Sequence, residues 1–325
     1  MRNETKTFIG PFASDIENYL NEKVNLGHKI TSYIYALKSF DTFSQQYNKN
    51  LKILTKELLE AWLNSKPNEK INNTLSRATI IRGFSKYMNM KNSSNYILVD
   101  GIYNKGIRYN AYIFSDLEIK KIFNEIDIKI QKNSNSYSAN STKIIFSLLY
   151  ACGMRVSEVL NIKVKDFDEH QKIITIYKGK NEKDRIIPLT NYLSDMITDF
   201  INKFQKYLKL ESFLFEHKNN NPYSRFTINH RFWKLLSKCH IHHDECGPRL
   251  HDFRHTFAVH CLRKWEQENK DLNVYLPILQ TYLGHSDFKC TAYYLKLTAD
   301  VYTKITEKIE KDFNIIVPYI GGETL

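Results

Sequence analysis

Residues 153–189 read GMRVSEVLNIKVKDFDEHQKIITIYKGKNEKDRIIPL, and the strand signal of the chain is confined to the second half of this stretch. Positions 172–177 and 184–189 alternate with β-branched residues and flank a turn at 178–183 that contains glycine. This pattern predicts a β-hairpin with a very basic tip. An apolar helix predicted over 143–152 stops at Gly153, a residue suited to a helix C-terminus. Since the remainder reads as helix, the sequence predicts a mainly α fold with a small antiparallel β-sheet.

The first hundred residues show helical periodicity. Ser14 and Glu17 have the spacing of a capping box, and apolar residues recur at three and four positions over 30–47. Two further helices are predicted over 56–63 and 72–88. We expect the aromatic residues of these helices to form a core. Their basic residues either form a solvated face or line a phosphate backbone: Lys38, Lys52, Lys56, Arg77 and Arg82.

The apolar period fails between residues 92 and 112, where glycine and asparagine gather, which indicates a linker. Ser115 and Glu118 then form a second predicted capping box, and the polar tract 131–141 is expected to be a loop. Two domains follow from these boundaries. We expect a helical domain over 1–95, a linker over 96–112 and a second domain with a C-terminal tail over 113–325.

Composition and charge indicate which kinds of binding partner the chain can have. A chain of 325 residues with 42% hydrophobic content can give two domains a core each. Its 47 Lys and Arg against 35 acidic residues leave a net charge of +12, which favours a polyanion such as nucleic acid, although charge alone is weak support. The longest apolar stretch, 144–154, is too short to span a bilayer, so no membrane partner is expected.

The N-terminus lacks the apolar core of a secretory signal, and the five cysteines are scattered, so we expect a reduced, cytoplasmic protein. One local cluster has zinc-ligand types, and its residues are Cys239, His240, His242, His243 and Cys246. No second pair lies at the customary distance from it. The interpretation that competes with a metal site is a polar loop before the next helix, and we expect no metal or nucleotide cofactor.

Six polar residues of the second half could carry chemistry: Arg155, Lys180, His251, Arg254, His285 and Tyr294. Each alone has an ordinary structural explanation, but together they suit in-line attack on a phosphodiester. Two arginines can clamp the non-bridging oxygens, which gain negative charge in the pentavalent transition state. A phenol needs a proton acceptor to become a nucleophile, and the leaving oxygen needs a donor. Such a set can replace the metal ions of many nucleases.

Four segments in this order and spacing resemble the tyrosine recombinase family, also called phage integrases. GMRVSEVLNIKVKDFD (153–168) resembles the first arginine box, and YKGKNEKDRIIPL (177–189) resembles the hairpin with its catalytic lysine. LHDFRHTFAVH (250–260) is similar to the His-x-x-Arg box. LGHSDFKCTAYYLKL (283–297) is similar to the closing His and Tyr box. The match covers roughly residues 113 to 297.

The resemblance implies a role for each residue. Arg155 and Arg254 hold the phosphate, and Lys180 protonates the leaving 5′-oxygen, with Lys183 as the neighbouring alternative. His251 and His285 bond the phosphate and assist proton transfer, while Glu158 orients the helix of the first arginine. Tyr294 forms a 3′-phosphotyrosine; Tyr293 competes, but the usual nine-residue gap from His285 favours Tyr294. The turn reads GKNEKDR where glycine after the lysine is commoner.

The same resemblance implies an assembly. The N-terminal helices resemble a SAM-like core-binding domain by helix count and position. A separate arm-site domain is expected to be absent, and the tail over 300–325 docks either into a neighbouring protomer or within its own chain. The implied partners are double-stranded DNA and a homo-tetramer on paired DNA sites. The abundance of Lys, Asn, Ile and Tyr indicates an AT-rich genome, so we expect the chain to serve a mobile element and not chromosome-dimer resolution. Two alternatives remain open: DNA relaxation of the type IB topoisomerase kind, and a DNA-binding protein without catalysis.

Overall fold

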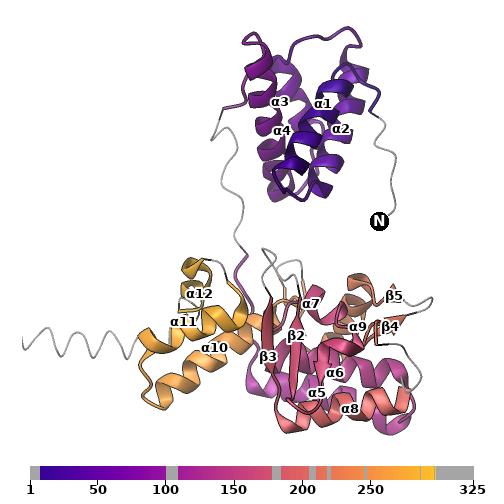
Figure 1. The fold of residues 1–325 in the computed structure, drawn as a ribbon, viewed down its shortest axis with the longest axis vertical. Helices are drawn as coiled ribbons and strands as arrows, with labels where there is room; N and C mark the ends of the chain where they lie inside the picture. The colour runs from indigo at the N-terminus through magenta and orange to yellow at the C-terminus, as the bar shows by residue number, and fades with distance from the viewer. Residues whose placement is uncertain are drawn as a thin grey trace, which may run out of the picture. The chain divides into compact units, whose positions relative to one another are not determined.

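A computed structural model describes residues 8–99, 109–177, 184–204, 210–217, 221–244, 247–285, 287–295 and 297. The chain divides into two compact units, Met1–Tyr109 and Asn110–Leu325, each with its own hydrophobic core. The expected fold class is confirmed, because helices dominate and the strands form small antiparallel sheets (Figure 1). Within the described ranges, no helix is both long enough and apolar enough to cross a bilayer.

Helices make up the described part of the first unit: α1 (Ala13–Asn25), α2 (Thr31–Tyr47), α3 (Lys56–Asn64) and α4 (Ile71–Lys91). They match the helices predicted over 30–47, 56–63 and 72–88 to within a few residues. Their apolar faces converge on aromatic rings, such as Phe40 against Trp62 at 5.4 Å and Tyr19 against Phe84 at 5.5 Å between centroids. Aromatic residues therefore build this core, as the periodicity predicted.

Two details of the first unit differ from the prediction. The Ser14–Glu17 capping box is wrong, because α1 already begins at Ala13 behind Phe12, and no side chain caps it. Arg77 does not belong to an exposed basic face. Its guanidinium is buried, donates to the Trp62 carbonyl oxygen at 2.6 Å and pairs with Glu69 at 2.9 Å. Arg77 is therefore buried because the fold offers its guanidinium these two acceptors.

Most of the second unit is helical, with α5 (Asp116–Lys132), α6 (Tyr137–Ala151), α7 (Val156–Leu160), the 3₁₀ turn η1 (Val164–Asp166), α8 (Asn191–Phe204), α9 (Arg225–Lys238), α10 (Asp252–Gln267), α11 (Leu272–Leu283) and α12 (Phe288–Leu295). The Ser115–Glu118 capping box is confirmed at the start of α5. The loop predicted over 131–141 is too long, since α5 continues to Lys132 and Ser136 caps α6.

The predicted hairpin is confirmed as β2 (Ile173–Ile176) and β3 (Arg185–Pro188), antiparallel with Ile176 opposite Arg185. A third strand, β1 (Phe167–Asp168), pairs with β2. The turn 178–183 lies outside the described residues. A second small sheet of β4 (Glu216–His217) and β5 (Asn221–Pro222) was not predicted. Strands of two residues carry no alternation, so periodicity could not reveal them.

Helix α10 organises the part of the unit that bears the candidate residues. On one side Phe253 packs into the main core with Phe114 and Phe146. On the other side Ala258 and Leu262 form a smaller cluster with residues of α11 and α12, including Tyr294. Helices α10, α11 and α12 lie together next to β3 (Figure 1). The hairpin, the His-x-x-Arg box and the closing His and Tyr box are therefore brought near one another by α10, α11 and α12.

The two ends of the expected 96–112 linker pack against the unit beside them. In the first unit, the Tyr96 amide donates to the Leu54 carbonyl oxygen at 2.8 Å, and Leu98 is buried in the core. In the second unit, the Ala111 amide donates to the Tyr293 hydroxyl at 3.4 Å. Residues 100–108 and the predicted tail over 300–325 lie outside the described residues.

Candidate active site

A tight turn after α6 brings the first candidate arginine into place. Gly153 has φ +58°, and a Cβ at this position would lie 2.4 Å from the Phe257 ring of α10. Glycine is therefore required both by the left-handed backbone and by the close approach of α10. The chain reverses here, and Arg155 follows at the N-terminal end of α7. Gly153 therefore ends the preceding helical segment, as predicted, and also allows the turn that positions Arg155.

Arg155 is held by a carboxylate of its own helix. Glu158 accepts the Arg155 amide at 2.8 Å and its Nη1 at 2.7 Å, while Arg155 Nη2 donates to the carbonyl oxygen of Gly284 at 3.0 Å. Burial alone raises the pKa of Glu158, but hydrogen bonds and charges from Arg185 and Arg155 outweigh it and lower that pKa to about 2. Glu158 is therefore ionised at neutral pH.

Arg254 is the central group of the site, with 1% of its surface exposed. Its Nη1 donates to the carbonyl oxygen of Gly153 at 2.8 Å, and its Nη2 donates to that of Leu283 at 2.6 Å. The same Nη2 lies 2.9 Å from Nε2 of His285. Burial lowers the pKa of Arg254 to about 10, so the guanidinium still carries its charge at neutral pH. Arg254 thus joins the turn before Arg155 to the end of α11.

Tyr294 of α12 lies beside Arg254 and His285, with 2% of its surface exposed. Its ring stacks on His285 with centroids 5.9 Å apart and also contacts His255 at 5.5 Å. Burial raises the pKa of Tyr294, and the nearby charges of Arg254 and Arg155 act in the opposite direction. The phenol keeps its proton at neutral pH, so a nucleophilic role requires a group that accepts this proton.

The neighbouring Tyr293 occupies a different environment. It is half-buried, and its hydroxyl accepts the Ala111 amide. Its ring lies 6.1 Å from His255 between centroids. The two adjacent tyrosines are therefore placed differently, and Tyr294, which the spacing from His285 favoured, is the one beside Arg254 and His285.

Two histidines lie at the start of α10, and the ring of one of them, His255, contacts Tyr294. His251 is the N-cap of the helix; one part of it is exposed, while its ring packs against the edge of the His255 ring with centroids 4.7 Å apart. Desolvation lowers the pKa of both imidazoles, and the charge of Arg254 lowers it further; that of His255 falls to about 4. Both rings are therefore neutral near pH 7, and each has one ring nitrogen that can accept a hydrogen bond.

The structure brings five of the six predicted residues together in the second unit: Arg155, His251, Arg254, His285 and Tyr294. The sixth, Lys180, lies outside the described residues together with its alternative, Lys183. Among the residues that the structure describes, no three His, Cys, Asp or Glu side chains form a group that could hold a metal ion. Cys246 of the sequence cluster is outside that part of the chain.

Three contributors to the site were missed in the sequence. Arg185 of β3 clamps Glu158, Thr291 lies 2.9 Å from Nδ1 of His285, and His255 contacts Tyr294. His255 stands directly after Arg254 and could have been noticed as a second imidazole of the same box. Nothing in the sequence around Arg185 or Thr291 indicates a role in the site. The partner of Arg185 is far away in the sequence, and the partner of Thr291 lies outside its own helix.

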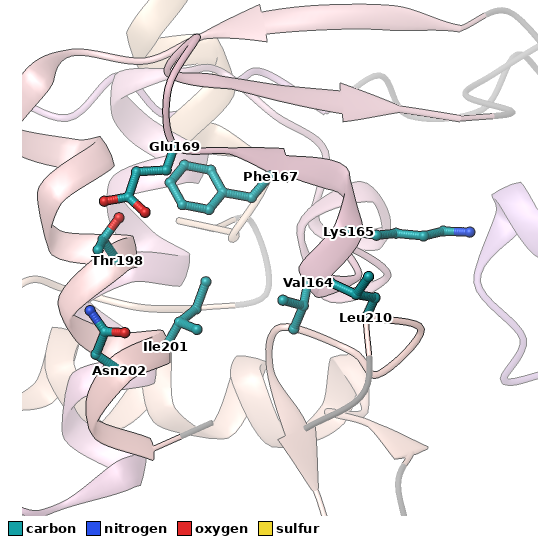
Figure 2. A pocket seen from close by; sticks show the side chains of 8 residues that line it. All are labelled: Val164, Lys165, Phe167, Glu169, Thr198, Ile201, Asn202 and Leu210. Carbon is teal, nitrogen blue, oxygen red and sulfur yellow. The ribbon is translucent and has the colours of Figure 1, made fainter. Parts of the chain in front are cut away.

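A pocket of about 340 Å³ lies elsewhere in the second unit, between η1, β1 and α8. Figure 2 shows Thr198, Asn202 and Glu169 on one side of it, with Lys165 pointing away. Apolar residues such as Ile201 and Val164 form much of the remaining wall. None of the five catalytic candidates that the structure describes lines this pocket, so their arrangement does not depend on it.

Comparison with known proteins places this arrangement in a family. The model of the phage integrase family matches residues 113–300. A tyrosine recombinase of Pseudothermotoga lettingae is 30% identical over 275 residues, which cover 82% of this chain and 87% of that protein. The tyrosine recombinase XerC of Staphylococcus epidermidis is 27% identical over 245 residues, covering 72% of this chain and 75% of its own.

Solved structures share the fold. The Tn1549 transposon integrase in complex with transposon right end DNA superposes with a TM-score of 0.64 at 14% identity, covering 91% of this chain and 99% of that chain. The XerH site-specific recombinase bound to its difH substrate superposes with a TM-score of 0.60 at 19% identity, covering 90% and 86%. Fold and site thus define a class of enzyme that is mainly helical and has two arginines beside a tyrosine. The chain belongs to the phage integrase family, the tyrosine-type site-specific recombinases.

Proposed function

We propose that the chain cleaves and rejoins double-stranded DNA at specific sites, with Tyr294 as the nucleophile and without a metal or nucleotide cofactor. The observation that carries the proposal is the position of Tyr294, buried between His285 and His255 and next to the charged guanidinium of Arg254. A phosphodiester that enters beside Arg155 and Arg254 meets two positive, forked donors and one phenol. The relatives that share the fold, including recombinases solved with DNA, support the same substrate.

The proposed reaction assigns one step to each residue. The Tyr294 oxygen attacks the phosphorus, and its proton passes to a neutral imidazole such as His251. Arg155 and Arg254 stabilise the negative charge that grows on the non-bridging oxygens, and His285 holds the Arg254 guanidinium in place through Nε2. Lys180, or Lys183 in its place, gives a proton to the leaving 5′-oxygen. The products are a 3′-phosphotyrosine and a free 5′-hydroxyl, and attack by a 5′-hydroxyl of a partner strand reverses the step.

The finer context is part of the proposal. Four copies of the chain assemble on paired DNA sites and exchange strands in pairs, and the helical first unit adds phosphate contacts as a core-binding domain. Cleavage and rejoining need no external energy source, because the phosphotyrosine bond formed in the first step replaces the phosphodiester bond that is broken. The enzyme serves the integration or excision of a mobile element. This choice rests on the abundance of Lys, Asn, Ile and Tyr in the chain, a composition that indicates an AT-rich genome.

Trapping the covalent intermediate tests the chemistry. The chain is incubated with labelled, fragmented genomic DNA from the organism that encodes it, denatured, and assayed for DNA that stays bound to protein. Wild type and Tyr293→Phe are expected to form the adduct, whereas Tyr294→Phe forms none and still binds DNA. Equal adduct with Tyr294→Phe means that another residue is the nucleophile. A wild-type chain that binds the fragments and forms no adduct favours the binding-only alternative.

Sequencing the attached ends and measuring the mass of the complex test the context. Ends that flank a mobile element support integration or excision, and ends at a single chromosomal site point to dimer resolution instead. A native mass of four chains on two duplexes is expected. A single chain that relaxes supercoiled DNA without joining two sites would favour the topoisomerase alternative.

A further inference from the structure

Arg185 is the residue of β3 that lies opposite Ile176, at the end of the strand next to the hairpin turn. Its two terminal nitrogens reach across to α7, where Nη1 donates to Glu158 Oε1 at 2.8 Å and Nη2 donates to Oε2 at 2.7 Å. This is a fork-to-fork pair, the strongest geometry available to a guanidinium and a carboxylate. Exposed fractions of 11% for the Arg185 side chain and 7% for Glu158 limit screening by solvent.

The arrangement decides how the charge of Glu158 is shared. Both carboxylate oxygens face Arg185, while Arg155 contributes one side-chain bond to Oε1 and its backbone amide to Oε2. Two guanidinium charges and one carboxylate charge leave the cluster with one positive charge. Without Arg185, Glu158 and Arg155 would form a one-to-one ion pair, and their charges would cancel.

A second contact ties Arg185 to the segment that carries His285. Gly284, the C-cap of α11, has φ +65°, and a Cβ at this position would lie 3.3 Å from both Cδ and Nη1 of Arg185. The carbonyl oxygen of the same glycine accepts Nη2 of Arg155. Arg185 therefore packs against the residue that orients the other side of the Arg155 guanidinium.

We propose that Arg185 is a positioning residue that neutralises Glu158 and thereby leaves the positive charge of Arg155 to the anionic DNA backbone. The inference rests on the proposed function, since it deepens the role of Arg155 in holding the scissile phosphate. It differs from a purely structural role, because it depends on a balance of charges that a second substitution can restore. The Glu158 carboxylate orients Arg155, but its negative charge would also cancel the positive charge of Arg155. Arg185 prevents this cancellation, because its own positive charge balances the carboxylate.

Covalent capture of labelled genomic fragments tests the inference with four variants of the full chain. Arg185→Gln is expected to lower the rate of adduct formation by about 10- to 100-fold, the usual effect of removing an outer partner of a functional group. Arg185→Lys keeps the neutralising charge and is expected to retain most of the rate. The double variant Arg185→Gln/Glu158→Gln restores one positive charge at Arg155, so it is expected to recover much of the rate that the single change lost.

Lys165→Gln is the matched control, because it removes one positive charge from an exposed ion pair with Glu211 and leaves the site intact. It is expected to form adduct at the wild-type rate. Thermal unfolding of each variant separates lost stability from lost charge. The inference is overturned if Arg185→Gln reacts as fast as wild type, or if the lysine and glutamine variants lose equally and the double variant recovers nothing. If wild type itself forms no adduct, the proposed function fails first, and the inference falls with it.

Discussion

Nε2 of His285 lies 2.9 Å from Nη2 of Arg254, and this contact fixes the protonation pattern of the imidazole. A guanidinium only donates, so Nε2 must accept, and the ring proton of neutral His285 resides on Nδ1. Nδ1 in turn lies 2.9 Å from the hydroxyl oxygen of the buried Thr291, which accepts that proton. A chain of three side chains from α10, the end of α11 and α12 thus sets the direction in which His285 can act.

Thr291→Val is expected to weaken this chain. Valine has the same shape but leaves the Nδ1 proton of His285 without its acceptor, which costs about 1–3 kcal/mol for a buried donor. Adduct formation on labelled genomic fragments and chemical denaturation measure the two effects. Thr291→Ser, which keeps the hydroxyl, is the control and should stay near wild type in rate. Equal rates for valine and serine would show that Thr291 does not orient His285.

Arg254→Lys is expected to abolish adduct formation and to destabilise the second unit by about 3 kcal/mol. A lysine cannot reach the carbonyl oxygens of Gly153 and Leu283 together, so at least one buried acceptor is left without its donor. Urea unfolding and the adduct assay measure both losses. A variant with wild-type stability and reduced rate would confine Arg254 to catalysis and contradict its bridging role.

Gly284→Ala and Gly27→Ala form a matched pair, since both glycines have positive φ, +65° and +77°. Each substitution should cost about 1 kcal/mol, the strain of a left-handed alanine. Nothing lies within 4 Å of a Cβ at Gly27, whereas a Cβ at Gly284 meets Arg185. Only Gly284→Ala is therefore expected to slow adduct formation. If both variants react like wild type, the Gly284 contact does not matter for the site.

Acid is expected to destabilise the second unit through Glu158. Its pKa is about 2 in the folded chain against 4.5 ordinarily, so its contribution is fully present above about pH 4.5 and is lost as pH falls toward 2. The contribution is about 3 kcal/mol, because one pKa unit corresponds to about 1.4 kcal/mol. Urea unfolding between these pH values should fall less steeply for Glu158→Gln. Glu211→Gln, in an exposed pair with Lys163 and Lys165, serves as the control and should keep the wild-type slope.

DNA binding is expected to weaken steeply with salt. A net charge of +12 and the phosphate contacts that we propose for both units would release many counterions, so affinity should fall about a thousandfold or more between about 50 and 200 mM salt. Fluorescence anisotropy with a labelled genomic fragment measures the slope. Tyr294→Phe should give the same slope, since it removes no charge. A flat response would contradict binding through the phosphate backbone.

Much of the fold could be predicted because it depends on local patterns. The hairpin at β2 and β3, the capping box at Ser115 and the helix that ends before Gly153 all follow from periodicity and turn chemistry. The predictions failed where a sequence pattern was too short to be recognised, or where a capping residue inside a polar stretch starts a helix. Strands β4 and β5 have two residues each, and the polar loop over 131–141 was shortened because Ser136 caps α6.

The candidate site divides in the same way. The residues of the four boxes were predicted together with their chemistry, since two arginines, histidines and a tyrosine in this order suit one reaction. The partners that fix them could not be predicted. Main-chain carbonyl oxygens at Gly153, Leu283 and Gly284 accept the guanidinium groups, and a carbonyl oxygen has no signature in a sequence.

The sequence by itself determined which chemical groups the chain owns and which helices and strands carry them, because residue type and spacing act over short distances. The spacing from His285 already favoured Tyr294 over Tyr293, but only the tertiary structure decided that His255 contacts Tyr294 and that Arg185 shares Glu158 with Arg155. The physical reason is burial. Charged groups removed from water must find donors and acceptors within the fold. Those partners come from the turn after α6, the end of α11 and β3, segments that meet only when the chain is packed.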